Sequence, residues 1–231
     1  MTVHKFRRPP GAPKEKFLNV EHSAPFMLVA ILVLAHLGYT LLPAAQKEFM
    51  FSAMALGAFD GNIFIEDGRP LGNFVSLLTY GLLHVDWTHV LTNAGMILAF
   101  GVITARGAKN AARPLLRRFS RPSSVFLGIF LAGVILGGLA QWLLWFGLST
   151  PGMAVVIGAS GGGAALFASA GWAMGGKERM FAFGIITLAI NAISVYLGAP
   201  LAWAAHVGGF VAGALLSPLW IRPSSVRGIV G

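Results

Sequence analysis

Long apolar stretches, separated by short polar connections, dominate the chain after its first two dozen residues. A membrane-spanning helix needs about 20 mostly apolar residues, and several stretches approach or exceed that length with hardly a charged residue. The pattern therefore predicts an all-α membrane protein with six spans. The predicted spans are residues 25–45, 89–105, 124–148, 153–175, 180–197 and 201–221.

The remaining segments are too polar or too short to cross a membrane. Residues 1–24 form a basic, proline-rich tail that cannot build a core and is predicted to be disordered. Residues 46–73 are predicted to be a mixed loop, and 74–83 a short apolar piece, either interfacial or re-entrant. The predicted organisation is thus the tail, one membrane domain over 25–221, and a short tail over 222–231.

Composition agrees with a membrane protein, since the chain is 56% hydrophobic, only 11% charged and has a mean hydropathy of +0.74. A net charge of +9 could suggest nucleic acid, but the basic residues lie between apolar spans instead of gathering on a folded surface, so no nucleic-acid partner is expected. The absence of cysteine excludes disulfides, thiolate zinc sites and a cysteine nucleophile.

Charge placement predicts the orientation, because cytoplasmic loops near spans are enriched in Lys and Arg. All of the 17 basic residues except Lys47 and Arg69 lie in the two tails, in the 106–121 loop or at 177–179. Both termini are therefore expected in the cytoplasm. With this orientation, polar residues of several spans fall in the outer half of the membrane, where we expect them to line one cavity open to the non-cytoplasmic side. These residues are His89, Asn93, Gln141, Ser160, Asn191 and His206.

Ser160 lies in Gly158-Ala159-Ser160-Gly161-Gly162-Gly163 at a predicted helix start. Small neighbours would let another chain approach the hydroxyl, and the helix N-terminus offers free N–H groups to an oxyanion. The same residues are also typical of tight helix packing. Both interpretations are open from this motif alone.

His206 shares a helical face with Gly209 and Gly213, a small-residue stripe that would bring a neighbouring helix close. If that neighbour carries Ser160, the histidine comes within reach of the hydroxyl, as a serine nucleophile requires. A buried histidine bonded to a backbone carbonyl is the alternative.

His89 and Asn93 are four residues apart and face the same way. Both can donate hydrogen bonds to an oxyanion, or can form an interfacial pair at a helix start. No HExxH motif and no aspartate within a span is present, which disfavours zinc-protease and aspartyl mechanisms and leaves Ser160 and His206 as a dyad. A metal site built from His84, His89 and His206 is a further alternative.

Together, and in this order, these motifs resemble the rhomboid intramembrane serine proteases. The resemblance covers roughly residues 25 to 220 and has three parts, one on each of spans two, four and six. They are His84, His89 and Asn93; Gly158-Ala159-Ser160-Gly161; and Ala205-His206 with Gly209 and Gly213.

The resemblance implies a six-helix bundle in which Ser160 is the nucleophile and His206 the general base. It also implies an oxyanion hole formed by His89, Asn93 and the Ser160 backbone N–H, with His84 structural near its rim. The resemblance further implies that the substrates are transmembrane proteins within the lipid bilayer and that no cofactor is needed. We expect no metal, and we expect the membrane to be a bacterial inner membrane.

The chain departs from the family pattern at two places. Val75-Ser76 stands where many members carry Trp-Arg, and Ala164 stands where bacterial members often stack an aromatic ring on the histidine. The leading hypothesis is a serine endopeptidase of transmembrane segments. A non-catalytic rhomboid-like binder of membrane helices is the alternative, and a small transporter is a third candidate, for which no inverted repeat is evident.

Overall fold

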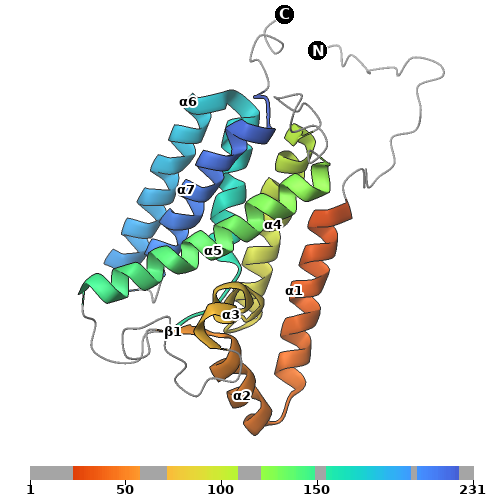
Figure 1. Ribbon diagram of the computed structural model, residues 1–231, viewed down its shortest axis with the longest axis vertical. Coiled ribbons are helices and arrows are strands. Elements are labelled where there is room, and N and C mark those ends of the chain that lie inside the picture. The colour runs from red at the N-terminus through yellow and green to blue at the C-terminus, as the bar shows by residue number, and fades with distance from the viewer. Residues whose placement is uncertain (1–22, 58–71, 109–120, 149–154, 199–201, 224–231) are drawn as a thin grey trace, which may run out of the picture.

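A computed structural model describes residues 23–57, 72–108, 121–148, 155–198 and 202–223. These residues form a helical bundle, with one two-stranded ladder near one end (Figure 1). The helices are α1 (Ser23–Leu41), α2 (Ala44–Met54), α3 (Gly72–Thr79), α4 (Trp87–Ala108), α5 (Pro122–Leu148), α6 (Ser160–Tyr196) and α7 (Trp203–Trp220), with a short 3-10 turn η1 at Tyr80–Leu82. The strands are β1 (Leu56–Gly57) and β2 (Val155–Val156).

The helix α6 is two helices joined by a sharp reversal. Gly175 and Gly176 depart from helical geometry, and Gly176 has a φ of 65° with a ψ of −148°, a conformation that favours glycine. The first half of α6, residues 160–174, rises through the bundle and the second half, 177–196, returns along its outside (Figure 1). This reversal lies where the break between the fourth and fifth spans was predicted.

The other helix ends follow from local sequence. Pro122 is the first residue of α5, where a missing N–H costs nothing, and Asp86 caps α4 by accepting from the His89 N–H at 2.8 Å. Gly198, with a φ of 70°, follows the end of α6. Pro43 separates α1 from α2. These four helix ends therefore carry residues suited to their positions.

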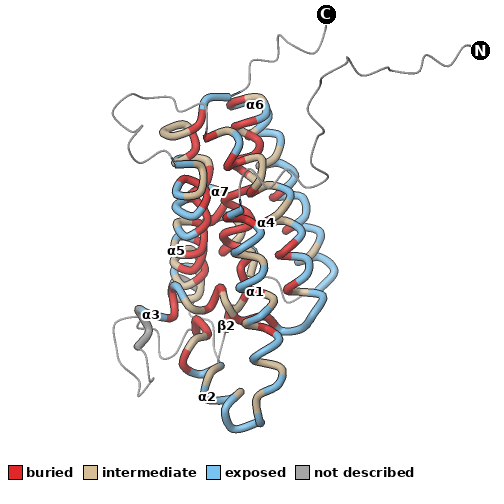
Figure 2. Tube along the Cα trace, turned by 90° about the vertical axis from the view of Figure 1, so that its right-hand side faces the viewer, coloured by how far each residue is buried: buried red, intermediate tan, exposed pale blue. Residues whose placement is uncertain are grey.

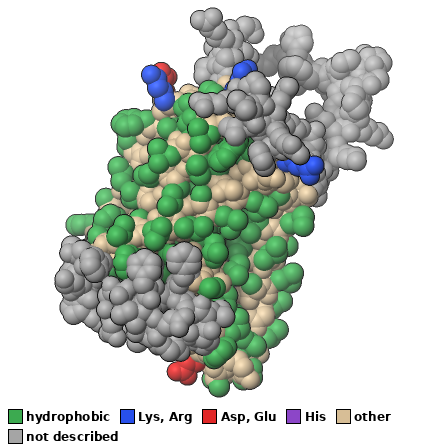
Figure 3. All heavy atoms as spheres, in the orientation of Figure 1, with side chains coloured by type: hydrophobic (Ala, Val, Ile, Leu, Met, Phe, Trp, Pro, Cys, Tyr) green, Lys and Arg blue, Asp and Glu red, His purple; other side chains and the backbone are tan. Residues whose placement is uncertain are grey.

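Four helices in the described part are long and apolar enough to cross a membrane, namely α1, α4, α5 and α6. Apolar side chains cover the flank of the bundle in view, and the Lys and Arg side chains coloured there lie near its upper end (Figure 3). The chain is therefore a mostly helical integral membrane protein. Its long helices overlap the six predicted spans, whose number and cytoplasmic termini stay predictions.

Several predicted boundaries were wrong. The fourth span was expected from residue 153, but the helix begins at Ser160 because Val155 and Val156 pair with Gly57 and Leu56 in β2 and β1. The supposed loop 46–73 contains most of α2. α1 already begins at Ser23, inside the expected tail, whose residues 1–22 lie outside the described part, as do 224–231 of the C-terminal tail.

The short apolar piece 74–83 folds as part of α3 and η1, and packs against α5, α2 and β1. Leu77 and Tyr80 are buried there, and the Tyr80 hydroxyl donates to the Val134 carbonyl at 2.6 Å. Val75 and Ser76 consequently lie on a helix, the first exposed and the second buried. This segment supports the beginning of α6 from one side.

Candidate active site

The connection from β2 to α6 presents Ser160 at a helix N-terminus. Gly158 has a φ of 115°, and a Cβ at this position would lie 2.6 Å from the His89 ring. Its N–H donates to the Tyr80 carbonyl at 2.9 Å. Because Ser160 is the first residue of α6, its own N–H has no acceptor within the helix. The hydroxyl and this N–H thus lie where a helix favours negative charge.

The His206 ring lies against this hydroxyl, with Nε2 2.8 Å from Ser160 Oγ. The glycine stripe of α7 accounts for the close approach. A Cβ at residue 209 would collide with the Gly161 carbonyl, and one at residue 213 with the Ala165 carbonyl. α7 can therefore rest directly on the backbone of the first half of α6, and the predicted juxtaposition of Ser160 and His206 is present.

Two buried amides hold the start of α7 from either side. Asn191, on the second half of α6, places Oδ1 3.0 Å from His206 Nδ1. Gln141, on α5, accepts from the Ala205 N–H through Oε1 at 3.3 Å. The sequence placed both amides at the depth of His206 without indicating these partners. The sequence contained one feature that could have indicated the partner of Asn191: this residue lies on the helix that directly precedes α7.

His89 and Asn93 reach from α4 toward the connection that leads to Ser160. The two side chains lie near Gly158, since a Cβ there would be 2.7 Å from His89 Nε2 and 3.6 Å from Asn93 Nδ2. Asn93 is 3% exposed, and its Nδ2 has no hydrogen-bond acceptor among the described residues. A buried donor without a partner is costly, and it could bind an oxygen of a reacting group.

His84 lies in the connection before α4 and is buried. Its Nε2 accepts from the Ala159 N–H at 3.4 Å, and its ring centroid is 5.0 Å from that of His89. Burial, followed by the charge of His89, lowers the pKa of His84 to about 4. A neutral ring can accept the Ala159 bond, so His84 supports the connection that leads to Ser160.

The ring of His36, from α1, packs edge-on against Trp87 at 4.8 Å and lies 6.3 Å from His84. His36 is thus buried beside the start of α4. Nothing in the described residues groups three or more His, Asp or Glu side chains for a metal ion.

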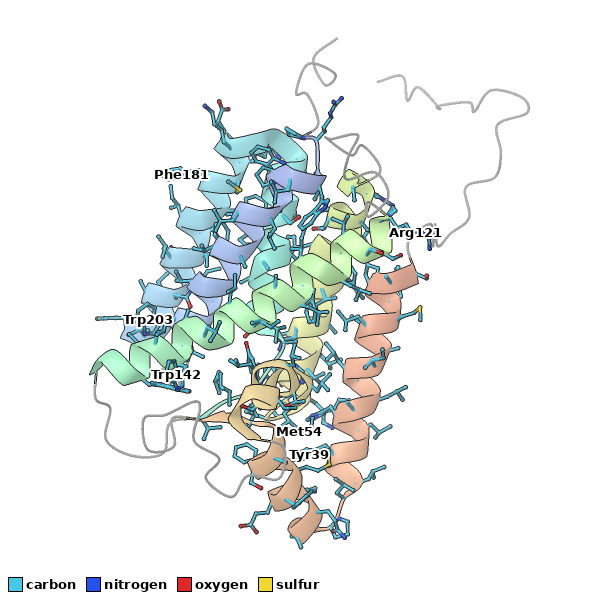
Figure 4. The ribbon with its side chains drawn as sticks, in the orientation of Figure 1. Tyr39, Met54, Arg121, Trp142, Phe181 and Trp203 are labelled. Atoms are coloured by element: carbon cyan, nitrogen blue, oxygen red, sulfur yellow. The ribbon has the colours of Figure 1, made fainter. Side chains whose placement is uncertain are left out.

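A cavity of about 840 Å³ opens onto Ser160 and His206. Among its lining residues are His89, Gln141, Trp145 and Trp203. Trp203 lies at the same end of the bundle as Trp142, far from Arg121 (Figure 4). Four of the six polar residues expected to line one cavity do so. The expectation was wrong for Asn191, which lines a neighbouring apolar pocket. It was also wrong for Asn93, whose side chain is buried and is not among the residues that line the cavity.

That neighbouring pocket, of about 270 Å³, is also lined by Ser160 and His206. Met96, Phe100 and Phe167 give it an apolar wall, and Ala164 lines it as well. The ring of Phe100 packs on that of Phe167 at 4.7 Å. The Ala164 side chain carries no ring that could stack on His206.

The fold and this site define a helical integral membrane protein with a serine and a histidine in hydrogen-bond contact beside a cavity that several polar side chains line. The rhomboid domain model matches residues 71–223, more than half of the chain, and the chain therefore belongs to the rhomboid family. Members of this family are typically serine proteases that act on membrane proteins within the bilayer, and non-catalytic rhomboid-like members also exist. No curated protein matches the chain at a significant level.

Proposed function

We propose that this protein is a serine endopeptidase that cleaves transmembrane segments of membrane proteins. The observation that carries the proposal is the 2.8 Å contact between His206 Nε2 and Ser160 Oγ. A serine hydroxyl is a weak nucleophile until an adjacent base accepts its proton. A non-catalytic helix binder would not require this contact.

In the proposed reaction, Ser160 Oγ attacks the carbonyl carbon of the scissile peptide while His206 Nε2 accepts the hydroxyl proton. The tetrahedral oxyanion is stabilised by the Ser160 N–H and by the His89 and Asn93 side chains. Breakage of the C–N bond transfers the proton from His206 to the leaving amine. A water molecule, activated by His206, then hydrolyses the acyl-enzyme and restores the Ser160 hydroxyl.

The test is cleavage of a reporter transmembrane segment by the purified protein in liposomes. Wild-type protein should cut it, and Ser160→Ala should lower kcat by at least about 10⁴-fold. Labelling by a fluorophosphonate, which reacts with activated serines, should be lost in the same variant. Cleavage that survives Ser160→Ala would exclude the proposal, and folded wild-type protein that neither cleaves nor labels would favour a non-catalytic binder.

Asn93 offers a separate test of the oxyanion role. Asn93→Ala should lower kcat by about 10²- to 10³-fold, the effect of losing one oxyanion donor. It should leave thermal stability unchanged or slightly raised, because it removes a buried donor that has no acceptor among the described residues. A fall in stability with unchanged kcat would instead assign Asn93 to the fold alone.

We also propose that the cavity opens to the non-cytoplasmic side of a bacterial inner membrane. Ser160 begins the first half of α6, whereas Lys177 and Arg179 lie at its other end, where basic residues favour the cytoplasm. Since the chain has no cysteine, single cysteines at positions 177 and 203 can be labelled in intact cells. An impermeant maleimide should react at 203 and not at 177, and the reverse result would invert the orientation.

A further inference from the structure

The amide of Asn191 lies directly behind the His206 ring, on the side away from Ser160. Its Oδ1 is 3.0 Å from His206 Nδ1, and its Nδ2 donates to the Thr187 carbonyl at 2.8 Å. Asn191 is 5% exposed. Ser160, His206 and Asn191 thus form one continuous line of hydrogen bonds.

The bond to Thr187 fixes which way the amide points. An amide turned by 180° would place its oxygen against the Thr187 carbonyl oxygen, so that two acceptors would face each other. The orientation with Nδ2 on Thr187 therefore directs Oδ1, an acceptor, at the imidazole. Backbone geometry of α6 sets this orientation, because Thr187 lies one turn before Asn191 on the same helix.

An acceptor at Nδ1 determines the tautomer of the neutral imidazole. Oδ1 cannot donate, so the ring proton resides on Nδ1 and the lone pair on Nε2. Nε2 is the atom that lies 2.8 Å from Ser160 Oγ. The tautomer favoured by Asn191 is therefore the one in which His206 can accept the serine proton.

We propose that Asn191 is a positioning residue that sets the tautomer and ring orientation of His206, which makes the site a Ser-His-Asn arrangement instead of an isolated dyad. The inference rests on the proposed protease function. It accounts for how His206 is held although Ala164 supplies no aromatic ring. Amide-oriented histidines also serve cysteine nucleophiles in papain-like proteases, so an amide is chemically sufficient for this role.

An amide suits this location better than a carboxylate would. Asn191 is buried within a membrane-embedded helix pair, where an unpaired charge is costly. Among the helices packed around the His206 ring, α4 contributes the ionisable side chain that acts on it electrostatically, namely His89. Helix α5 contributes Gln141, which is uncharged, and Asp86 lines the same cavity. Asn191 orients the ring without adding a charge.

The primary experiment compares Asn191→Ala and Asn191→Leu with the matched control Thr187→Val, one helical turn away. Loss of the acceptor should lower kcat by about 10- to 100-fold with KM nearly unchanged, because the ring loses its orientation while substrate contacts persist. Thr187→Val keeps the backbone carbonyl that Asn191 needs and should retain wild-type kcat. Equal losses in Thr187→Val and Asn191→Ala would reduce Asn191 to a packing role and overturn the proposal.

Asn191→Asp is the rescue variant, since a carboxylate also accepts from Nδ1. It should recover most of the kcat lost in Asn191→Ala. The acidic limb of its pH–rate profile should move to higher pH, because a negative charge beside the ring stabilises the protonated imidazole. Activity as low as that of Asn191→Ala in a folded Asn191→Asp protein would contradict the proposed role.

A measurement independent of catalysis is the ¹⁵N chemical shift of the His206 ring in detergent, assigned by its absence in His206→Gln. Wild-type protein should show the proton on Nδ1, and Asn191→Leu should shift the population toward Nε2–H. An unchanged tautomer in Asn191→Leu would refute the inference even if wild-type protein cleaves in a Ser160-dependent way. Failure of wild-type protein to cleave would instead refute the proposed function.

Discussion

The two halves of α6 belong to one continuous chain segment but lie in different surroundings. The first half is buried on nearly all sides, with Leu166, Ala168 and Ala170 fully enclosed (Figure 2). The second half exposes most of its large apolar side chains, including Ile190 and Phe181, the latter pointing away from the bundle (Figure 4). The buried half carries Ser160 and the exposed half carries Asn191.

The proposed nucleophile therefore lies on the enclosed half of α6, and the proposed positioning residue lies on the half at the periphery of the bundle. The first half gains its rigidity from backbone contacts with α5 and α7, at positions where even a methyl group would not fit. The second half is held on one face only, and Asn191 contacts His206 from that face. Substitutions in the first half should therefore affect the fold, and equivalent substitutions in the second half should affect it little.

The largest expected effect comes from filling the contact between α7 and the first half of α6. Gly209→Ala places a methyl group against the Gly161 backbone and should destabilise the protein by about 3 kcal/mol or more, with loss of activity. Gly128→Ala in α5 is the control, because a Cβ there meets no atom within 4 Å. Thermal unfolding in detergent measures both. Equal melting temperatures would show that the helices separate at little cost.

A matched pair of leucines compares the two halves directly. Leu166→Ala removes a side chain that is 0% exposed and should cost about 2 to 5 kcal/mol. Leu188→Ala, at a side chain 58% exposed, should change stability by only about 0.5 kcal/mol. Similar losses in the two variants would mean that the second half is covered by something other than lipid or detergent, such as a second copy of the chain.

A further expected effect is a pH dependence that arises beside the first half, at His84. Its pKa is about 4 in the folded protein, below the ordinary value of 6.5. The unfolded chain therefore binds the proton more readily, and stability should fall as the pH decreases from about 6.5 toward 4. Melting temperatures measured across this range should decline less steeply in His84→Gln. A parallel decline in both proteins would assign the effect to other groups.

Much of this organisation was predictable because it depends on local sequence. Apolar length predicted the long helices, the break between residues 175 and 180 separated the fourth and fifth spans, and the small-residue stripe beside His206 predicted close packing against a neighbouring helix. Each of these features depends on one continuous segment of the chain, so it can be recognised from the residues of that segment alone. The family motifs then indicated the chemistry.

The unpredicted features all depend on pairs of distant residues. Helix α2 is mixed in polarity, so no apolar run predicted it. The ladder of β1 and β2 contains only two residues per strand, which is too short to give a sequence pattern. The contacts of Asn191 with His206 and of Gln141 with Ala205 require knowledge of which helices are neighbours and how they are rotated. Their predicted depth in the membrane indicated that these residues lie at one level, but it could not indicate which of them form hydrogen bonds with each other.

The two-stranded ladder connects the matched domain to residues that precede it in the chain. The rhomboid domain match begins at residue 71, yet β1, at residues 56–57, pairs with β2 just before the Gly158 to Ser160 connection. His36 in α1 likewise contacts Trp87 and His84. A fragment cut at residue 71 would keep every proposed reacting group but leave β2 an open edge. The part of the chain that supports the site is therefore larger than the matched domain, and it includes β1 and α1.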